Sequence, residues 1–146
     1  MKKVLIIEDD QIVGTVYERF LRAHGFEVEI ARDGAAGLEQ IPVFQPDAVL
    51  LDLMMPKMGG LEVLRRIRLE DAWRELPVIV MTAANLPAFT EQAAAIGATR
   101  IFDKANHKPL AVTELLHDLL HTTSDASLIS ISKSGNPDAV LENWPD

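Results

Sequence analysis

The strongest constraint on the fold is an alternation of short apolar runs with amphipathic stretches along the chain. Three of the runs, at residues 4–7, 48–51 and 78–81, contain only aliphatic side chains or methionine. Such runs are typical of central strands in a parallel sheet, which are buried on both faces. The stretches between the runs carry apolar residues at helical spacing, for example Val13, Tyr17 and Leu21. The alternation therefore predicts strands that are linked by helices.

Five strand–helix units follow from this pattern. A strand at residues 27–30 alternates glutamate with Val28 and Ile30, which predicts an edge strand with one side in water. A last strand is expected at residues 100–102, and a helix from Gly34 is expected to stop near Pro42. The predicted fold is α/β, a doubly wound five-stranded parallel sheet in the order 2-1-3-4-5 with helices on both faces.

The regular pattern ends near residue 121. Residues 122–146 contain five serines, one glycine and two prolines, and these interrupt any helical or strand periodicity. We therefore predict one domain at residues 1–121 and a loosely ordered C-terminal tail or linker at residues 122–146.

Composition narrows the classes of function. Lys and Arg number 14 and Asp and Glu number 22, so the formal net charge is −8. A domain this acidic repels nucleic-acid phosphates and anionic membranes. Cysteine is absent, which excludes disulfides, thiolate metal sites and cysteine nucleophiles. No signal-peptide pattern is present, and no apolar stretch approaches the roughly 18 residues that span a bilayer. We expect a cytoplasmic protein that binds neither nucleic acid nor membrane.

Polar side chains that could carry chemistry follow four of the predicted strands. Glu8 and Asp9 follow the first strand, Asp52 the third, Thr82 the fourth and Lys104 the fifth. Ligands of open parallel sheets bind at the carboxyl ends of the strands, where the strand order reverses. The three carboxylates would converge there, and Mg²⁺ would relieve their mutual repulsion. With a hydroxyl and an ammonium group beside it, this site predicts phosphoryl transfer to an aspartate.

Four stretches, at residues 4–10, 47–60, 77–83 and 97–104, resemble the receiver domain of two-component response regulators. The most specific stretch is Asp52-Leu53-Met54-Met55-Pro56-Lys57-Met58-Gly59-Gly60. The resemblance covers residues 2–121 and implies a flavodoxin-like receiver fold. It also implies a regulatory phosphoacceptor domain rather than an enzyme, one that assists only its own phosphorylation and dephosphorylation.

The resemblance implies a role for each acidic residue. Asp52 would accept the phosphoryl group from a sensor histidine kinase or a phosphotransfer protein. Glu8, Asp9 and Asp52 would hold Mg²⁺, with the backbone carbonyl of Met54 as a further ligand.

The remaining site residues would carry the response. Lys104 would pair with the phosphoryl oxygens, and Thr82 would rotate inward to hydrogen-bond them. That motion would repack a protein-interaction face and so change the contact with a downstream protein target. The resemblance leaves a homodimer that forms on phosphorylation open.

The chain departs from the family pattern at several positions. Ala105 follows Lys104, where the family usually has a proline whose peptide bond is often cis. Ile101 occupies the switch position that is often aromatic. Met54 and Ala84 lie two residues beyond Asp52 and Thr82, and neither side chain can orient an attacking water molecule. We therefore expect slow self-dephosphorylation.

Three other interpretations are weighed against this one. His117 and His121 loosely echo a zinc-protease motif, but Asp118 stands where glutamate is needed and no third ligand is apparent, so a solvated helix face explains the pair better. A hydrolase that turns over an aspartyl phosphate usually has a second acid at the position of Met54. A receiver fold that no longer takes phosphate is disfavoured because the five site residues are all present.

Overall fold

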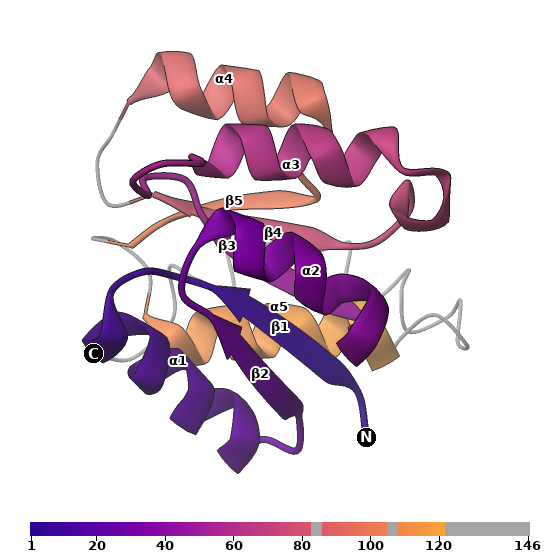
Figure 1. Cartoon of the computed structure of the whole chain (residues 1–146). Helices are drawn as coiled ribbons and strands as arrows, with labels where there is room; N and C mark the ends of the chain where they lie inside the picture. The colour runs from indigo at the N-terminus through magenta and orange to yellow at the C-terminus, as the bar shows by residue number, and fades with distance from the viewer. Residues whose placement is uncertain (83–85, 105–107, 122–146) are drawn as a thin grey trace.

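Five parallel strands form one sheet in the order β2-β1-β3-β4-β5 in the computed structural model, which describes residues 1–82, 86–104 and 108–121 (Figure 1). The strands are β1 (Lys3–Ile7), β2 (Glu27–Ala31), β3 (Ala48–Asp52), β4 (Val78–Thr82) and β5 (Arg100–Asp103). The predicted fold class and strand order are confirmed. β2 lies at an edge of the sheet, and its Glu27 and Glu29 are exposed as expected.

Helices cover both faces of the sheet (Figure 1). They are α1 (Gln11–Ala23), α2 (Gly34–Phe44), α3 (Gly60–Leu69), α4 (Pro87–Ile96) and α5 (Pro109–His121), with a 3₁₀ turn η1 (Asp71–Trp73). One apolar cluster lies between the sheet and α1 and α5, and a second lies between the sheet and α2, α3 and α4. None of the helices in the described ranges is long and apolar enough to cross a bilayer.

Alternation along the strands divides the core between these two clusters. Ile6 and Leu50 belong to the α1/α5 cluster, whereas their neighbours Ile7 and Leu51 belong to the α2/α3/α4 cluster. Successive side chains of a strand point to opposite faces, so a strand buried on both faces must be apolar throughout. This is why the continuous apolar runs predicted the central strands.

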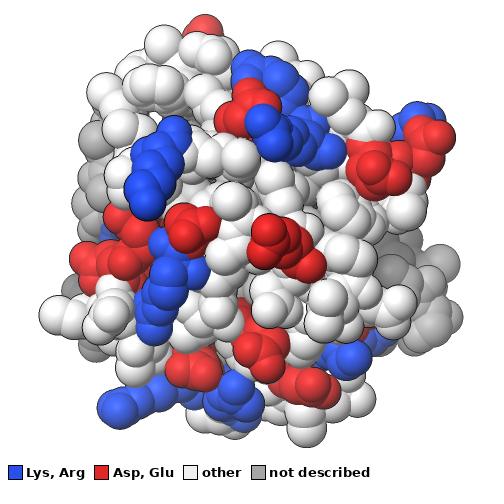
Figure 2. All heavy atoms as spheres, in the orientation of Figure 1, with Lys and Arg blue, Asp and Glu red and all other residues white. Residues whose placement is uncertain are grey.

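Charged side chains lie outside this core. Figure 2 shows Lys and Arg side chains interspersed among Asp and Glu side chains on one face of the molecule. Glu8 and Asp52 are exceptions, because both are buried.

Local hydrogen bonds explain where α1 and α2 begin. The Asp10 side chain accepts hydrogen bonds from the backbone N–H groups of Ile12 at 2.9 Å and Val13 at 3.1 Å. The Asp33 side chain accepts one from the N–H of Ala36 at 2.8 Å. Both aspartates are therefore N-caps, which satisfy donors that a helix leaves unpaired in its first turn.

The expected end of α2 near Pro42 is wrong, because the helix continues through Pro42 to Phe44. A proline removes one helical hydrogen bond, but Ile41 and Phe44 are buried under the sheet and their packing offsets that loss. The helix ends at Gln45, which has a left-handed backbone and donates its N–H to Ile41 at 2.9 Å. The turn η1 was not predicted.

Some expectations lie outside the described residues. These are the tail at residues 122–146 and the positions of Ala84 and Ala105. The domain boundary at residue 121 therefore stays a prediction.

The connection from β3 to α3 depends on a glycine. A Cβ atom on Gly60 would lie 2.6 Å from the Cα of Leu53 and closer still to the carbonyl oxygen of Asp52. Both neighbours are backbone atoms of a buried strand end, so they cannot move aside as the tip of a flexible side chain could. The first turn of α3 thus packs directly against the backbone of Asp52.

We expect Gly60→Ala to lower the free energy of unfolding by about 1–3 kcal/mol, because the added methyl group overpacks this contact. Urea denaturation measures the change. Gly59→Ala is the matched control, because its Cβ would meet no atom closer than 3.9 Å. Equal stabilities of the two variants would contradict the prediction.

Candidate metal centre

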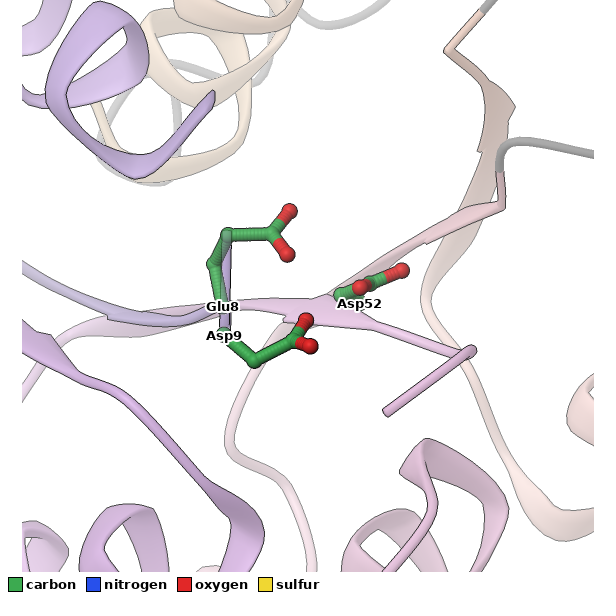
Figure 3. A group of neighbouring side chains, drawn as sticks. All are labelled: Glu8, Asp9 and Asp52. Atoms are coloured by element: carbon green, nitrogen blue, oxygen red, sulfur yellow. The ribbon is translucent and has the colours of Figure 1, made fainter. Parts of the chain in front are cut away.

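Three carboxylates meet at the carboxyl ends of β1 and β3. Glu8 and Asp9 directly follow β1, and Asp52 is the last residue of β3. Ligand oxygens of the three side chains lie within 4.8 Å of one another, and Figure 3 shows the carboxylates gathered around a common space. β1 and β3 are paired with Ile7 beside Leu51, so the residues that follow them, Glu8 and Asp52, are also neighbours. The structure thus brings together the acidic residues that the sequence indicated.

The pleat of the sheet explains why Glu8, Asp52 and Lys104 point to the same face. Ile6, Leu50 and Phe102 belong to the α1/α5 cluster. Each site residue lies two residues after one of them in the sequence. Strand-type pairing continues past the strand ends, because the N–H of Glu8 donates to Ala31 at 3.0 Å. Side chains two residues apart share a face.

Lys104 provides the positive charge of the site. Its Nζ lies 2.6 Å from Oε1 of Glu8 and 3.4 Å from Oδ1 of Asp52. Glu8 is fully buried and Asp52 is 3% exposed, so this ion-pair network lies largely outside bulk water. Pairing in a low dielectric is strong, and it offsets part of the desolvation of the carboxylates.

Asp9 differs from the other two acids because it is exposed. It gives the site an open side through which an ion could enter. The donor set consists of three carboxylates, which are hard oxygen ligands, and one side is accessible to water. Such a set fits a hard divalent cation of the magnesium class, which keeps several waters when it is bound.

Glu8 is the most strongly perturbed acid in the site. Burial raises the pKa of its carboxyl from 4.5 to about 7, and the hydrogen bond with Asp52 raises the pKa as well. The hydrogen bond from Lys104 acts in the opposite direction. Glu8 therefore holds a proton to near neutral pH unless additional positive charge enters the site. A divalent cation would favour the ionised form.

Met54 and Thr82 lie beside the acidic cluster. The backbone N–H of Met54 donates to Oδ1 of Asp52 at 3.2 Å, while the Met54 side chain is exposed. Thr82 ends β4, the strand adjacent to β3, and is 3% exposed. By the alternation that holds for Val80 and Met81, Thr82 lies on the face of α3 and α4. The roles expected for the Met54 carbonyl and the Thr82 hydroxyl stay predictions.

The histidine pair belongs to a separate aromatic group. The rings of His117 and His121 are 5.0 Å apart, and His117 packs 4.7 Å from Phe26. Its Nε2 hydrogen-bonds the carbonyl of His24 at 2.9 Å. Within the described ranges, the acidic cluster is the only group of three residues arranged to hold a metal. The rejection of zinc chemistry stays a prediction.

The position expected to act as the switch holds Ile101 and so has no aromatic ring. Ile101 is half-buried against the α2/α3/α4 cluster, and Phe102 is buried in the α1/α5 cluster on the opposite face.

Sequence reasoning missed two residues near the acids. Tyr17 was treated as one apolar member of a helical stripe, yet burial and the charges of Glu8 and Asp52 raise the pKa of its hydroxyl to about 12. Arg32 follows the edge strand, and its Nη1 lies 3.5 Å from the carbonyl oxygen of Asp10 at the rim of the site. The position of Arg32 at a strand end was a usable signal, whereas no local pattern distinguishes Tyr17 from a packing residue.

Known proteins share this arrangement of elements. A model of the response regulator receiver domain matches residues 4–120. Response regulator MprA of Mycobacterium ulcerans (strain Agy99) is 39% identical over 114 residues, which is 78% of this chain and 47% of that protein. The chain thus spans about half the length of the curated relatives that it matches.

Solved structures agree at the level of the fold. Chemotaxis response regulator CheY4 of Vibrio cholerae is 28% identical with a TM-score of 0.75, covering 82% of this chain and 99% of that chain. The signal receiver domain of a DNA binding response regulator protein (merR) from Colwellia psychrerythraea 34H is 29% identical with a TM-score of 0.75, covering 82% of this chain and 98% of that chain.

The raised pKa of Glu8 has a consequence for stability. The folded protein binds the Glu8 proton more tightly than the unfolded chain does, so this contribution is present in full below pH 4.5 and is lost as the pH rises through about 7. In cation-free buffer, the free energy of unfolding should fall between about pH 5 and about pH 8, and Glu8→Gln should remove on the order of 1–3 kcal/mol of that fall.

Urea denaturation at the two pH values, with a chelator present, measures the difference. Glu29→Gln is the control, because Glu29 is exposed on the edge strand. If the wild type and Glu8→Gln show the same pH dependence, the burial argument for Glu8 is wrong.

Proposed function

The chain belongs to the response regulator receiver domain family, whose model matches residues 4–120, and from this we propose that Asp52 is its phosphoacceptor. As a receiver domain of two-component response regulators, it is a regulatory domain. The observation that carries the proposal is the meeting of Glu8, Asp9 and Asp52 within 4.8 Å beside the ammonium group of Lys104. This is an anionic nucleophile next to positive charge, as phosphoryl transfer requires.

Asp52 would act as the nucleophile. One of its carboxylate oxygens attacks the phosphorus of a phosphohistidine on a sensor kinase or phosphotransfer protein. The bond from phosphorus to the histidine nitrogen breaks, and its electron pair leaves with the imidazole. The product is an acyl phosphate on Asp52. The hydrogen bond from Met54 N–H to Oδ1 of Asp52 orients the carboxylate for this attack.

Glu8, Asp9 and Asp52, together with the backbone carbonyl of Met54, would hold Mg²⁺. When bound, Mg²⁺ supplies charge neutralisation for the phosphoryl oxygens. Glu8 and Asp52 are buried and Asp9 is exposed, so two ligands are held by the core while the third faces the entry side. The chain would assist its own phosphorylation and dephosphorylation and no other reaction.

Lys104 and Thr82 would respond to the negative charge of the phosphoryl group. Lys104 is within 3.4 Å of Asp52, so a phosphoryl group on that residue would compete with Glu8 for the ammonium. Thr82 lies at the end of the next strand and would turn toward the phosphoryl oxygens. Both residues belong to the β4 and β5 side of the sheet, so a change there would alter the surface around α4 and α5.

Partners follow from the same proposal. The phosphoryl donor would be a sensor histidine kinase or a phosphotransfer protein, and the output would be contact with a downstream protein. We propose a cytoplasmic location, no direct contact with nucleic acid or membrane by these residues, and leave a phosphorylation-dependent homodimer open. Residues 1–121 would be the receiver unit, with residues 122–146 as a tail or linker.

Incubation with acetyl phosphate and Mg²⁺ should give a single phosphoryl adduct by intact-protein mass spectrometry. Asp52→Ala should lose the adduct, because the nucleophile is gone, while the control Asp71→Ala should retain it, because Asp71 is exposed on η1. Turnover of acetyl phosphate without an adduct would instead indicate a hydrolase. Absence of both would indicate a receiver fold that no longer takes phosphate.

The acyl phosphate should persist well beyond seconds after the donor is removed. The exposed Met54 side chain cannot hydrogen-bond an attacking water. Met54→Asn supplies an amide at that position and should shorten the lifetime by about tenfold. Loss of the mass adduct with time measures both rates, and Leu69→Asn at the exposed end of α3 is the control. Loss of the mass adduct from the wild type within seconds would contradict this prediction.

A further inference from the structure

Tyr17, the only tyrosine of the chain, is a largely buried residue whose hydroxyl bonds no protein group in the described part of the chain. It lies on α1 between the sheet and α5 and is 5% exposed. Its hydroxyl makes no hydrogen bond with any residue in the described ranges. No fully buried polar side-chain atom in the described ranges lacks a partner. The Tyr17 hydroxyl therefore reaches solvent, where a water molecule can bond it. Packing alone would be served equally well by phenylalanine.

The course of α1 directs this side chain toward the acidic site. Side chains of a helix lean toward its N-terminus, and α1 begins at Gln11, directly after the acidic turn. Gly14 lies one turn before Tyr17, and a Cβ atom there would be 3.8 Å from Cγ of Glu8. The α1 surface one turn before Tyr17 therefore lies next to the side chain of Glu8.

The sheet places two of the acids on the same side as Tyr17. Glu8 and Asp52 continue the alternation that puts Ile6 and Leu50 in the α1/α5 cluster, which also contains Tyr17. In Figure 3 the carboxylate of Glu8 lies on the opposite side of the strand from that of Asp9. After burial, the charges of Glu8 and Asp52 are what raises the pKa of the Tyr17 hydroxyl, so both carboxylates are near enough to act on it.

We propose that Tyr17 is a positioning residue of the metal centre, whose hydroxyl hydrogen-bonds the Glu8 carboxylate through a water molecule and thereby strengthens cation binding. The inference rests on the proposed magnesium site. A phenol both donates and accepts hydrogen bonds, so it can orient a water molecule between itself and a carboxylate. Groups that orient metal ligands in this way commonly change metal affinity by an order of magnitude or more.

Tyr17→Phe tests the hydroxyl alone, because it keeps the ring and its packing. Isothermal titration calorimetry with MgCl₂ should show a Kd about 3–10-fold weaker than that of the wild type. Thr113→Val is the matched control. Thr113 is fully buried in the α5 part of the same core, but its hydroxyl bonds Pro109 of its own helix at 2.9 Å. Its loss should leave the Mg²⁺ Kd unchanged even if it lowers stability.

A second measurement uses the wild-type sequence. Biosynthetic 3-fluorotyrosine gives one ¹⁹F resonance, because the chain has one tyrosine. That resonance should shift during an Mg²⁺ titration and yield the same Kd as calorimetry. A residue that only packs the core would give a stationary signal.

The outcomes separate the two levels of the argument. If the wild type binds no Mg²⁺, the proposed function fails together with the inference. If the wild type binds Mg²⁺ but Tyr17→Phe binds it equally well or more tightly, only the inference about Tyr17 is overturned. A stationary ¹⁹F resonance in a chain that binds Mg²⁺ also overturns the inference alone.

Discussion

The structure depends on one electrostatic imbalance at the end of its sheet. Glu8 and Asp52 are buried next to each other, and a single ammonium, that of Lys104, reaches both. Together with Asp9, the ionised site carries three negative charges against one positive charge. The pleat holds Glu8 and Asp52 on one face, so they cannot separate to relieve repulsion. A proton on Glu8 relieves it partly, and a divalent cation balances it completely. The strained acid pair is thus what makes the site receptive to a cation.

Most of the fold and the site could be predicted because their signals are local. The apolar runs identify the central strands, and polar residues directly after them identify the functional edge of the sheet. The end of α2 was predicted too early, at Pro42, because the packing of Ile41 and Phe44 outweighs the helix-breaking effect of the proline. The ion pair between Lys104 and Glu8 joins residues 96 positions apart. Sequence spacing predicts that such groups converge but not which atoms pair. Tyr17 was missed because the helical pattern counts it as an apolar residue and carries no information about its hydroxyl.

The relatives place the chain in a family whose members differ in length. MprA of Mycobacterium ulcerans matches over 47% of its length, whereas the solved CheY4 of Vibrio cholerae is covered almost entirely. The matched unit therefore occurs both as most of a protein and as part of a longer one. The residues of the acidic edge lie within the matched range, residues 4–120.

The tight passage of Gly60 over the backbone of Asp52 has a mechanical consequence. The main chain of Asp52, the proposed acceptor, lies between β4 and the first turn of α3 and is held in place there. Any force that a new substituent on Asp52 exerts must then be transmitted through side chains of the neighbouring strands. Under the proposed function, signals would leave this molecule sideways across the sheet, toward β4 and β5, while the main chain of Asp52 stays in place.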